Sequence, residues 1–552
     1  SFWNCQNKFY ACIIKSDIWN KGMKKERVVL LGASGTMGFA AFQELWKKRG
    51  QYEIVLLLLP DIREKLTFKP YEILANIKSI PGRGNVQGDG LKIIWGDATD
   101  YDDVLLAIEG ADWVLNAMAY ISPMADYYPK KARAVNVDAV DNVIKAILAQ
   151  PNGKEHIRYI HTGTVAETGD RQPPIHWGRA GDPLNPSVFD FYAITKIAGE
   201  RAVLESDLQY WASIRMTYII PTDFKRYMKL QDPIMFHMPL QTCMENISNR
   251  DAGSGLVNAL NISKESDFWR KVYNMGGGPG MRTTAYAYMN KTYKMLGLSG
   301  CRKVNDRNWF ALRNFHLQYF LDSHICNHYL QYWRDSMDDI WYALQKSMPL
   351  SLKTLSFLCK ISPIIRKLVE RQTHALLNIL VEHHANGTRN WYLNKKDQRI
   401  FAFFKNYETY EAIPDWEQID LLSEVEPVQQ ILEHGYDESK QNLSLMDLQK
   451  AAHFRGGKCI STEWIGDLYH PLIWKCAFNH EFTSKPFTIL KAGHWCPVCV
   501  NPPWNGDVQA RKNPFFAQVW TANHGPAENN SYSMESFEDI AAAEEVFKNR
   551  KH

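Results

Sequence analysis

Tyr192 and Lys196 have the residue types and the spacing of an acid–base pair. On a helix, residues four apart share a face, so the ammonium group of Lys196 would lie near the phenol of Tyr192. A nearby positive charge favours the phenolate, whose usual pKa is about 10, and so allows proton transfer closer to neutral pH. Tyr127 and Lys131 repeat the spacing, but the intervening Pro129 argues against a shared helix face. Tyr192 and Lys196 are therefore the stronger catalytic candidates.

Two threonines precede this pair and offer a hydroxyl group to a reacting oxygen. Residues 158–161 form a strand-like run, which Thr162, Gly163 and Thr164 follow. Ligands of doubly wound sheets lie outside the carboxyl ends of the strands. A threonine at this point could hold an oxygen atom while Tyr192 moves its proton.

Glycines spaced three residues apart form a second candidate site. Gly32, Gly35 and Gly38 lie between an apolar run, 28–31, and a helix-like run, 39–48. A strand, a glycine-rich turn and a helix in this order present backbone N–H groups to the pyrophosphate of a dinucleotide. The residues that we expect to bind the cofactor here are Gly32, Ser34, Gly35, Thr36, Met37 and Gly38.

The choice between NAD and NADP depends on the end of the second predicted strand. An acidic residue there would bind the ribose 2′-hydroxyl of NAD, and Asp61 is the candidate. Arg63 and Lys65 would instead suit the 2′-phosphate of NADP. We therefore expect NAD(P), with a slight preference for NADP and Arg63 as a cofactor-binding residue.

Four soft ligands near the C-terminus predict a metal site. Cys476 and His480 are followed, after fifteen intervening residues, by Cys496 and Cys499. Two such pairs can close a tetrahedral zinc site, which with four protein ligands is structural and not catalytic. The alternatives are a small core of reduced side chains and, less favoured, redox chemistry by the two C-terminal cysteines. The segment resembles small zinc-ribbon or treble-clef units, with Cys459 and His494 as spare ligands.

The elements that must position these residues alternate between strands and helices from residue 27 to about 278. This alternation predicts an α/β fold with a doubly wound parallel sheet of the Rossmann type. The predicted strands are 28–31, 54–59, 92–95, 113–117, 158–161, 213–218 and 272–275. We divide the chain into an N-terminal extension (1–22), an NAD(P)-binding catalytic domain with its substrate-binding part (23–300), a mostly helical region (301–450), a zinc-binding unit (451–505) and a C-terminal tail (506–552).

The helical region carries leucines and isoleucines on one helical face among several basic residues, between positions 353 and 371. Packing against the catalytic domain is the favoured interpretation, and binding to a membrane surface as a basic amphipathic helix is the alternative. Pro363 predicts a break or kink in this segment. The aromatic residues of this region and the segment 233–239 suggest an apolar lid, which mildly favours an apolar substrate.

The segment from about residue 27 to residue 300 resembles the extended short-chain dehydrogenases/reductases, which include NAD-dependent epimerases/dehydratases and 3β-hydroxysteroid dehydrogenases. The glycine turn matches the cofactor turn of that family, and Gly96-Asp97 resembles its adenine-contacting pair. The segment 115–119, with Ala117, takes the place of its fourth-strand motif, and the segment 136–143 resembles its Asn-Val helix motif. The resemblance implies that Thr164, with Thr162 as a rival, Tyr192 and Lys196 form the catalytic set. Glu167-Thr168-Gly169 stands where Val-Tyr-Gly is usual, and the family's uridine-diphosphate pattern is missing.

These observations predict an NAD(P)-dependent enzyme that acts on a secondary alcohol or ketone by hydride transfer. Epimerases and dehydratases of the family use the same oxidation transiently, so net redox chemistry does not follow. The alternative is a cofactor-sensing regulator whose zinc unit binds nucleic acid or protein. The 64 basic and 60 acidic residues give a net charge of only +4, which gives nucleic-acid binding little support. We expect a small-molecule substrate and a cytoplasmic location, with no transmembrane segment, and leave a homodimer open.

Overall fold

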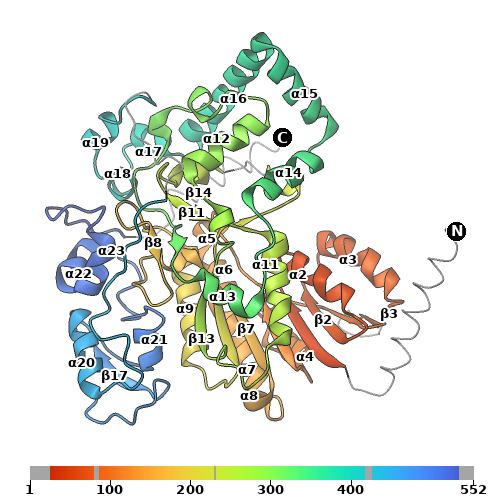
Figure 1. Cartoon of the computed structure of the whole chain (residues 1–552), viewed down its shortest axis with the longest axis vertical. Coiled ribbons are helices and arrows are strands. Elements are labelled where there is room, and N and C mark those ends of the chain that lie inside the picture. The colour runs from red at the N-terminus through yellow and green to blue at the C-terminus, as the bar shows by residue number, and fades with distance from the viewer. Residues whose placement is uncertain (1–24, 80–85, 229–231, 417–425, 534–552) are drawn as a thin grey trace.

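A sheet of nine strands forms the centre of the molecule (Figure 1). The computed structural model describes residues 25–79, 86–228, 232–416 and 426–533. The strands, in spatial order, are β13 (Lys271–Met275), β9 (Trp211–Met216), β7 (Arg158–Thr164), β6 (Trp113–Asn116), β1 (Glu26–Leu31), β2 (Tyr52–Leu58), β5 (Leu91–Trp95), β4 (Val86–Gly88) and β3 (Lys78–Ser79). The first seven are parallel, and β4 and β3 extend the edge in antiparallel fashion. The predicted doubly wound sheet is confirmed, because the chain order reverses between β1 and β6.

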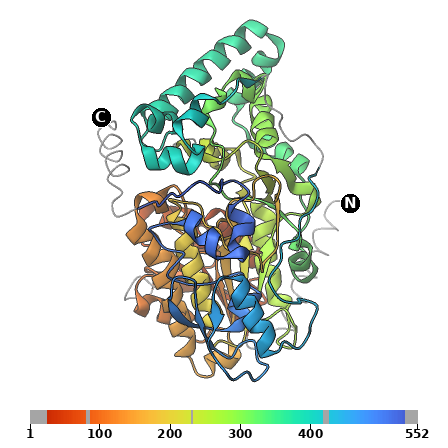
Figure 2. The ribbon, with the colours of Figure 1, turned by 90° about the vertical axis from the view of Figure 1, so that its left-hand side faces the viewer.

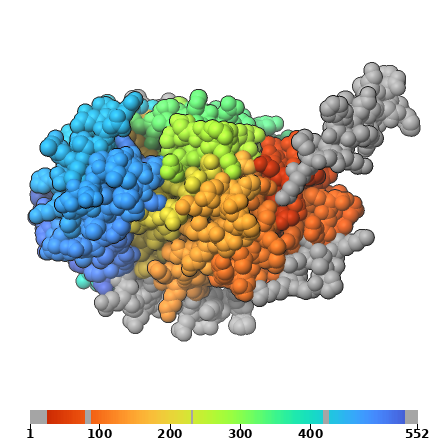
Figure 3. All heavy atoms as spheres, turned by 90° about the horizontal axis from the view of Figure 1, so that it is seen from below, coloured from red at the N-terminus to blue at the C-terminus, as the bar shows by residue number. Residues whose placement is uncertain are grey.

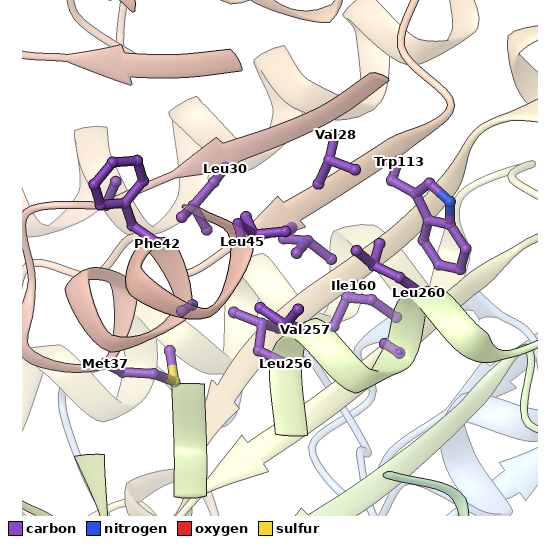
Figure 4. Close-up of a cluster of buried hydrophobic side chains, with 14 of the residues drawn as sticks. Val28, Leu30, Met37, Phe42, Leu45, Trp113, Ile160, Leu256, Val257 and Leu260 are labelled. Atoms are coloured by element: carbon purple, nitrogen blue, oxygen red, sulfur yellow. The ribbon is translucent and has the colours of Figure 1, made fainter. Parts of the chain in front are cut away.

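Strand β1 shows why this sequence builds a buried parallel sheet. Its last four residues, Val28–Leu31, have no solvent-exposed surface, as expected for a strand covered on both faces. Val28 and Leu30 pack with α2 (Thr36–Lys47) and α11 (Asn249–Asn258), as Figure 4 shows. The alternate side chains, Val29 and Leu31, pack on the opposite face with the helices α4 (Tyr101–Ile108), α7 (Ala139–Leu148) and α9 (Phe191–Glu205).

The first half also contains helices and short strand pairs outside the main sheet. The helices are α3 (Ile62–Leu74), α5 (Met124–Tyr127), α6 (Pro129–Arg133), α8 (Gly153–His156), α10 (Phe224–Tyr227) and α12 (Ala285–Met295). Three two-stranded pairs lie outside the main sheet: β10 (Ile219–Ile220) with β12 (Ile247–Ser248), β11 (Cys243–Glu245) with β14 (Arg282–Thr284), and β15 (Tyr319–Phe320) with β8 (Trp177–Gly178).

The predicted helical region is helical up to residue 411. Its helices are α13 (Ser323–Leu330), α14 (Met337–Ser347), α15 (Leu350–Ile361), α16 (Pro363–His383), α17 (Thr388–Leu393), α18 (Asp397–Phe404) and α19 (Tyr407–Glu411). Pro363 breaks the segment as predicted, since α15 ends at Ile361 and Pro363 begins α16. The expected apolar lid at 233–239 is wrong: Phe236 is fully buried and its ring lies 5.1 Å from that of Phe310, inside a second hydrophobic core.

The predicted zinc unit is a small domain that packs against the sheet domain. It contains α20 (Leu445–Phe454), β16 (Lys458–Cys459), β17 (Leu472–Lys475), β18 (Glu481–Ser484) and α21 (Pro486–Leu490), and its three strands are antiparallel. The unit has a small core of its own around the fully buried Trp474. It also shares a core with the sheet domain, because Phe487 and Ala492 pack in the same cluster as Val203 and Trp211. In Figure 3 the blue C-terminal residues abut the yellow residues of the sheet domain.

The predicted C-terminal tail is folded through residue 533. Two helices, α22 (Gly506–Lys512) and α23 (Pro514–Trp520), pack with Phe189 and Trp391 in a further core, and Trp504 forms a strand-like bridge with Tyr532. Figure 2 shows these helices in front of the sheet domain. The predicted N-terminal extension, 1–22, and the tail residues 534–552 lie outside the described residues. Among the described helices, none has both the length and the apolar character that crossing a bilayer requires.

Candidate functional site

The three glycines of the turn between β1 and α2 have three different roles. Gly32 has a φ of +78°, and a Cβ there would lie 2.8 Å from the backbone of Ala117 and Met118. A Cβ on Gly38 would lie 2.0 Å from the Gly32 carbonyl oxygen, so this glycine allows helix and turn to pack closely. A Cβ on Gly35 would meet only that carbonyl oxygen, at 3.4 Å, and would otherwise point into open space.

The N-terminus of α2 is ready to receive an anion. Its N-cap is Gly35, which offers no side-chain cap, and its first turn holds no acidic residue. The backbone N–H groups that begin at Thr36 therefore face the space beside Gly35, where a pyrophosphate would be bound. Met37 packs its side chain in the core, so only its backbone is available to a ligand. The residues present fit a dinucleotide.

Glu64 is a candidate cofactor-binding residue that the sequence analysis missed. The Ser34 hydroxyl donates a 2.7 Å hydrogen bond to Oε1 of Glu64, while Oε2 is buried without a hydrogen-bond partner. Burial raises the pKa of Glu64. Asp61 caps α3 by accepting a hydrogen bond from the Glu64 backbone, and Arg63 lies exposed in the first turn. The signal that could have found Glu64 is an acidic residue shortly after the second strand.

Asp97 and Ala117 lie at the ends of the strands on either side of the β1–β2 pair. Asp97 follows β5, is exposed, and accepts a hydrogen bond from the Thr99 backbone. Ala117 follows β6, and its N–H donates to the Leu31 carbonyl oxygen over 3.0 Å. The structure therefore brings the predicted cofactor residues to one edge of the sheet, at the carboxyl ends of its strands.

Thr164 and Tyr192 meet at the same edge of the sheet. Thr164 is the last residue of β7, Tyr192 is the second residue of α9, and their side chains are hydrogen-bonded. Burial raises the pKa of Tyr192, and the bond to Thr164 acts in the opposite direction. Thr162, the rival, donates its hydroxyl hydrogen to the Asn116 carbonyl oxygen over 2.8 Å. The structure thus pairs Tyr192 with Thr164 and not with Thr162.

Lys196 lies one turn after Tyr192, but its ammonium group is bonded to another residue in this structure. The ammonium group donates to the Thr162 carbonyl oxygen, and Lys196 is fully buried. Burial lowers the pKa of Lys196 to about 8, although the carboxylates of Glu167 and Glu200 act against this change. The predicted pair therefore shares a helix face. In this structure, however, the Lys196 ammonium group is bonded to β7 and lies near the buried carboxylates.

Two carboxylic acids cap the helix that carries Tyr192. Asp190 accepts a hydrogen bond from the Ala193 backbone, and Asp126 accepts one from the Phe191 backbone, each over 2.8 Å. Tyr127, the residue with competing spacing, ends α5, whereas Lys131 belongs to α6. The Tyr127 hydroxyl donates to Asp232. Tyr127 and Lys131 therefore do not share one helix face.

A buried ionic network links the catalytic strand to the zinc unit, and the sequence analysis missed it. Oε1 of Glu167 accepts the Thr164 N–H over 2.8 Å, and Arg215 lies 3.4 Å from Glu167 and 2.6 Å from Glu200. His494 of the zinc unit lies 2.9 Å from the Glu200 carboxylate. Burial alone would raise the pKa of Glu200, but Arg215 and His494 hold it well below its usual range.

The four predicted metal ligands converge. The Nδ1 atom of His480 lies 3.4 Å from the sulfurs of Cys476 and Cys499 and 3.5 Å from that of Cys496. The Cys476 and Cys499 sulfurs are 3.9 Å apart. Bond lengths of about 2.3 Å for Zn–S and about 2.0 Å for Zn–N imply tetrahedral edges of about 3.8 and 3.5 Å. The donor set and its size therefore fit a tetrahedral zinc ion.

A cavity lies behind α9, the helix that carries Tyr192. It has a volume of about 420 Å³ and is lined by Ile194, Ile197 and Arg201 of α9, by residues of the zinc unit and by Trp504. Tyr192 and Lys196 project from the opposite face of α9. The cavity therefore does not support the predicted preference for an apolar substrate.

The fold is a doubly wound α/β sheet domain, and the turn between β1 and α2 is of the kind that binds a dinucleotide. Residues 28–224 match the model of the NAD dependent epimerase/dehydratase family. The resemblance deduced from the sequence is confirmed for this part. None of the curated proteins compared with the chain matches it.

Three of the solved structures to which the chain is similar come from bacteria. The chain is similar to UDP-glucose 4-epimerase from Bifidobacterium longum, solved with NAD+ and UDP, with 15% identity over 58% of this chain and 97% of that chain and a TM-score of 0.43. It is also similar to dTDP-glucose 4,6-dehydratase from Bacillus anthracis, solved with NAD, with 12% identity, 58% and 96% coverage and a TM-score of 0.42. The NAD complex of WbmG from Bordetella bronchiseptica shares 18% identity, with 60% and 98% coverage and a TM-score of 0.40.

Proposed function

We propose that the chain is an NAD(P)-dependent oxidoreductase, epimerase or dehydratase that oxidises a secondary alcohol or reduces a ketone at Tyr192. The observation that carries this proposal is the hydrogen bond between Tyr192 and Thr164 at the carboxyl end of β7. That edge of the sheet also carries the uncapped N-terminus of α2. A nicotinamide ring held there supplies the hydride acceptor or donor.

The side chains divide the remaining work. The Tyr192 oxygen removes the hydroxyl proton of an alcohol substrate, or returns it to a ketone, as general acid–base catalyst. Thr164 donates a hydrogen bond to the same substrate oxygen and orients it. Lys196, positively charged below its pKa of about 8, favours the Tyr192 phenolate through space once its ammonium group turns from the Thr162 carbonyl oxygen toward the site.

The cofactor preferred by this site is NAD, in contrast to the slight preference for NADP drawn from the sequence. The unpaired Oε2 of Glu64 can accept a hydrogen bond from a ribose hydroxyl, as an acidic residue does in NAD sites. A 2′-phosphate at the same place would meet a carboxylate. The exposed Arg63 and Lys65, near the start of α3, are the groups that would favour the phosphate.

The Cys476–His480–Cys496–Cys499 cluster binds one structural zinc ion in this proposal. The support is the size of the ligand cluster, which matches a tetrahedral site without rearrangement. Four protein ligands leave no open coordination position for a substrate, so the metal stabilises the unit and takes no part in the reaction.

The test is a single-turnover screen with stoichiometric NAD+ and pooled secondary alcohols, including sugar nucleotides, read as the growth of reduced-cofactor absorbance. The wild-type protein should reduce NAD+ with at least one pool, and Tyr192→Phe should bind the cofactor equally well without reducing it. Metabolites that co-purify with Tyr192→Phe would identify the substrate class. Tight cofactor binding with no turnover by any pool, together with salt-dependent retention of DNA, would contradict the proposal and favour a regulator.

A further inference from the structure

The hairpin formed by α15 and α16 presents apolar side chains to solvent. It forms the top of the molecule in Figure 1, away from the main sheet. On α15, Leu350 is 80% exposed, and Phe357 and Ile361, seven and eleven residues later on the same face, are each 60% exposed. On α16, Ile364 is 82% and Leu368 is 57% exposed. Large apolar side chains gathered on the exposed side of one hairpin are typical of an interaction site.

The inner faces of the same helices account for how the hairpin is held. Ser356 and Cys359 of α15 are buried, and the Ser356 hydroxyl donates to the Met295 carbonyl oxygen over 3.1 Å. Leu377 and Val381 of α16 are buried in the second hydrophobic core. The hairpin therefore packs on the enzyme as favoured from the sequence, but with a different face from the one that is exposed and apolar.

Basic residues accompany the exposed apolar face. Lys360, Lys367 and Arg371 are exposed on the hairpin, and between residues 350 and 371 five basic residues stand against one acidic residue. That acidic residue, Glu370, accepts a hydrogen bond from the Ser299 backbone over 2.6 Å. The outward charge of the hairpin is therefore positive.

We propose that the outer face of α15 and α16 binds an anionic lipid bilayer surface, with the apolar side chains entering the headgroup region and the basic ones paired with lipid phosphates. An amphipathic element with large apolar residues and a basic flank lies in the plane of such an interface. The positive charge of the hairpin favours an anionic bilayer over a second copy of the chain. A second hairpin would bring two positive faces together, whereas an anionic surface attracts both basic helices. The proposal is independent of the chemistry at Tyr192.

The test is co-sedimentation of the full-length protein with vesicles of phosphatidylcholine, with and without about a quarter of phosphatidylglycerol. The wild-type protein should sediment with the anionic vesicles at low salt, much less with neutral ones, and less again as salt screens the attraction. Ile364→Glu/Leu368→Glu and Lys367→Glu/Arg371→Glu should each weaken binding at least about tenfold. Their matched controls are Ile465→Glu and Lys450→Glu, which change an exposed apolar and an exposed basic residue of the zinc unit and should bind like the wild type.

Three results would overturn the proposal. One is no sedimentation of wild-type protein with anionic vesicles at low salt. Another is equal binding by the hairpin variants and their controls while all variants retain the wild-type melting temperature. The third comes from analytical ultracentrifugation: a dimer that becomes a monomer in Ile364→Glu/Leu368→Glu would show that this face joins two copies of the chain. A wild-type sedimentation coefficient retained in that variant would support the bilayer surface.

Discussion

The zinc cluster and the catalytic cluster differ in how complete they are in the structure. The four metal ligands already lie at the distances that a tetrahedral ion requires, between 3.4 and 3.9 Å. In the catalytic cluster, Tyr192 meets Thr164, but the Lys196 ammonium group is bonded to the Thr162 carbonyl oxygen and burial raises the pKa of Tyr192. In the roles that we propose, the first site needs only its ion, whereas the second needs a change of charge before it can catalyse proton transfer.

The difference follows from what each site is made of. The metal ligands come from two short segments fixed by β17 and by the turn after α21, so local backbone geometry nearly completes the site. The candidate catalytic residues come from a strand and a helix. The charged side chains of that helix also belong to a buried ionic network, in which Lys196 interacts with Glu200 and Glu200 with His494. The same helix, α9, therefore carries both the catalytic tyrosine and the bond to the zinc unit.

The largest expected effect is on turnover at the incomplete site. Tyr192→Phe should lower turnover by at least about a hundredfold, because general acid–base catalysis is typically worth ~10²–10⁴. Cofactor affinity should stay within about twofold, since Tyr192 is needed for the proton and not for the pyrophosphate. Tyr127→Phe, measured by the same steady-state assay, is the matched control and should retain most activity. A larger loss of turnover in Tyr127→Phe than in Tyr192→Phe would show that Tyr192 is not the catalytic residue.

The complete site should affect stability more than chemistry. Cys496→Ser/Cys499→Ser should lose the one zinc ion per chain, seen by elemental analysis, and expose the zinc unit to protease. Because Phe487 and Ala492 share a core with Val203, the melting temperature of the sheet domain should fall as well. Cys243→Ser, at a buried cysteine outside the cluster, should leave the zinc content unchanged. Purified wild-type protein without zinc would contradict this account.

The link between the two sites is the next test. Glu200→Gln removes a buried charge that faces Arg215 and His494, and loss of one partner of a buried ion pair costs about 3–5 kcal/mol of unfolding free energy. Glu44→Gln, in an exposed pair with Lys47, should change it by less than about 1 kcal/mol. Denaturant titration measures both. Equal effects of the two substitutions would show that the network does not hold α9.

A β-branched side chain in the glycine turn should weaken cofactor binding without destabilising the fold. Gly35→Val places its side chain in the space beside the N-terminus of α2, where only the Gly32 carbonyl oxygen is near. Affinity for NADH should fall at least about tenfold because the pyrophosphate must approach this backbone closely. The melting temperature of the cofactor-free protein is the control and should change little. Unchanged NADH affinity would remove the phosphate-binding role of this turn.

The smallest effect concerns the choice of cofactor. Wild-type protein should bind NADH more tightly than NADPH, and Glu64→Gln should reduce that preference by about tenfold, the value of one charge-assisted hydrogen bond. Glu72→Gln changes an acidic residue about two turns further along α3 and is the control. Fluorescence titration with both cofactors gives the ratio. A wild-type preference for NADPH would instead favour Arg63 as the residue that selects the cofactor.

The sequence predicted the parts whose residues are close together in the chain. The glycine turn, Tyr192 with Lys196, and the Cys/His cluster each depend on spacings of a few residues, and the seven parallel strands on apolar runs. Contacts between distant segments could not be read this way. Ser34 and Glu64 are 30 residues apart, and Glu200 and His494 are 294 apart, so their pairing follows only from the packing of whole elements.

The pKa of Tyr192, measured with and without cofactor, is the sharpest test of whether Tyr192 is the acid–base catalyst. The difference in tyrosinate absorbance between the wild-type protein and Tyr192→Phe reports this phenol alone. Without cofactor, the difference should stay near zero up to pH ~10, because burial holds the pKa above its usual value. Saturating NAD+ should bring a positive nicotinamide ring and a charged Lys196 to the phenol, so that the Tyr192 signal appears below pH ~9. The same titration curve with and without NAD+ would contradict the account.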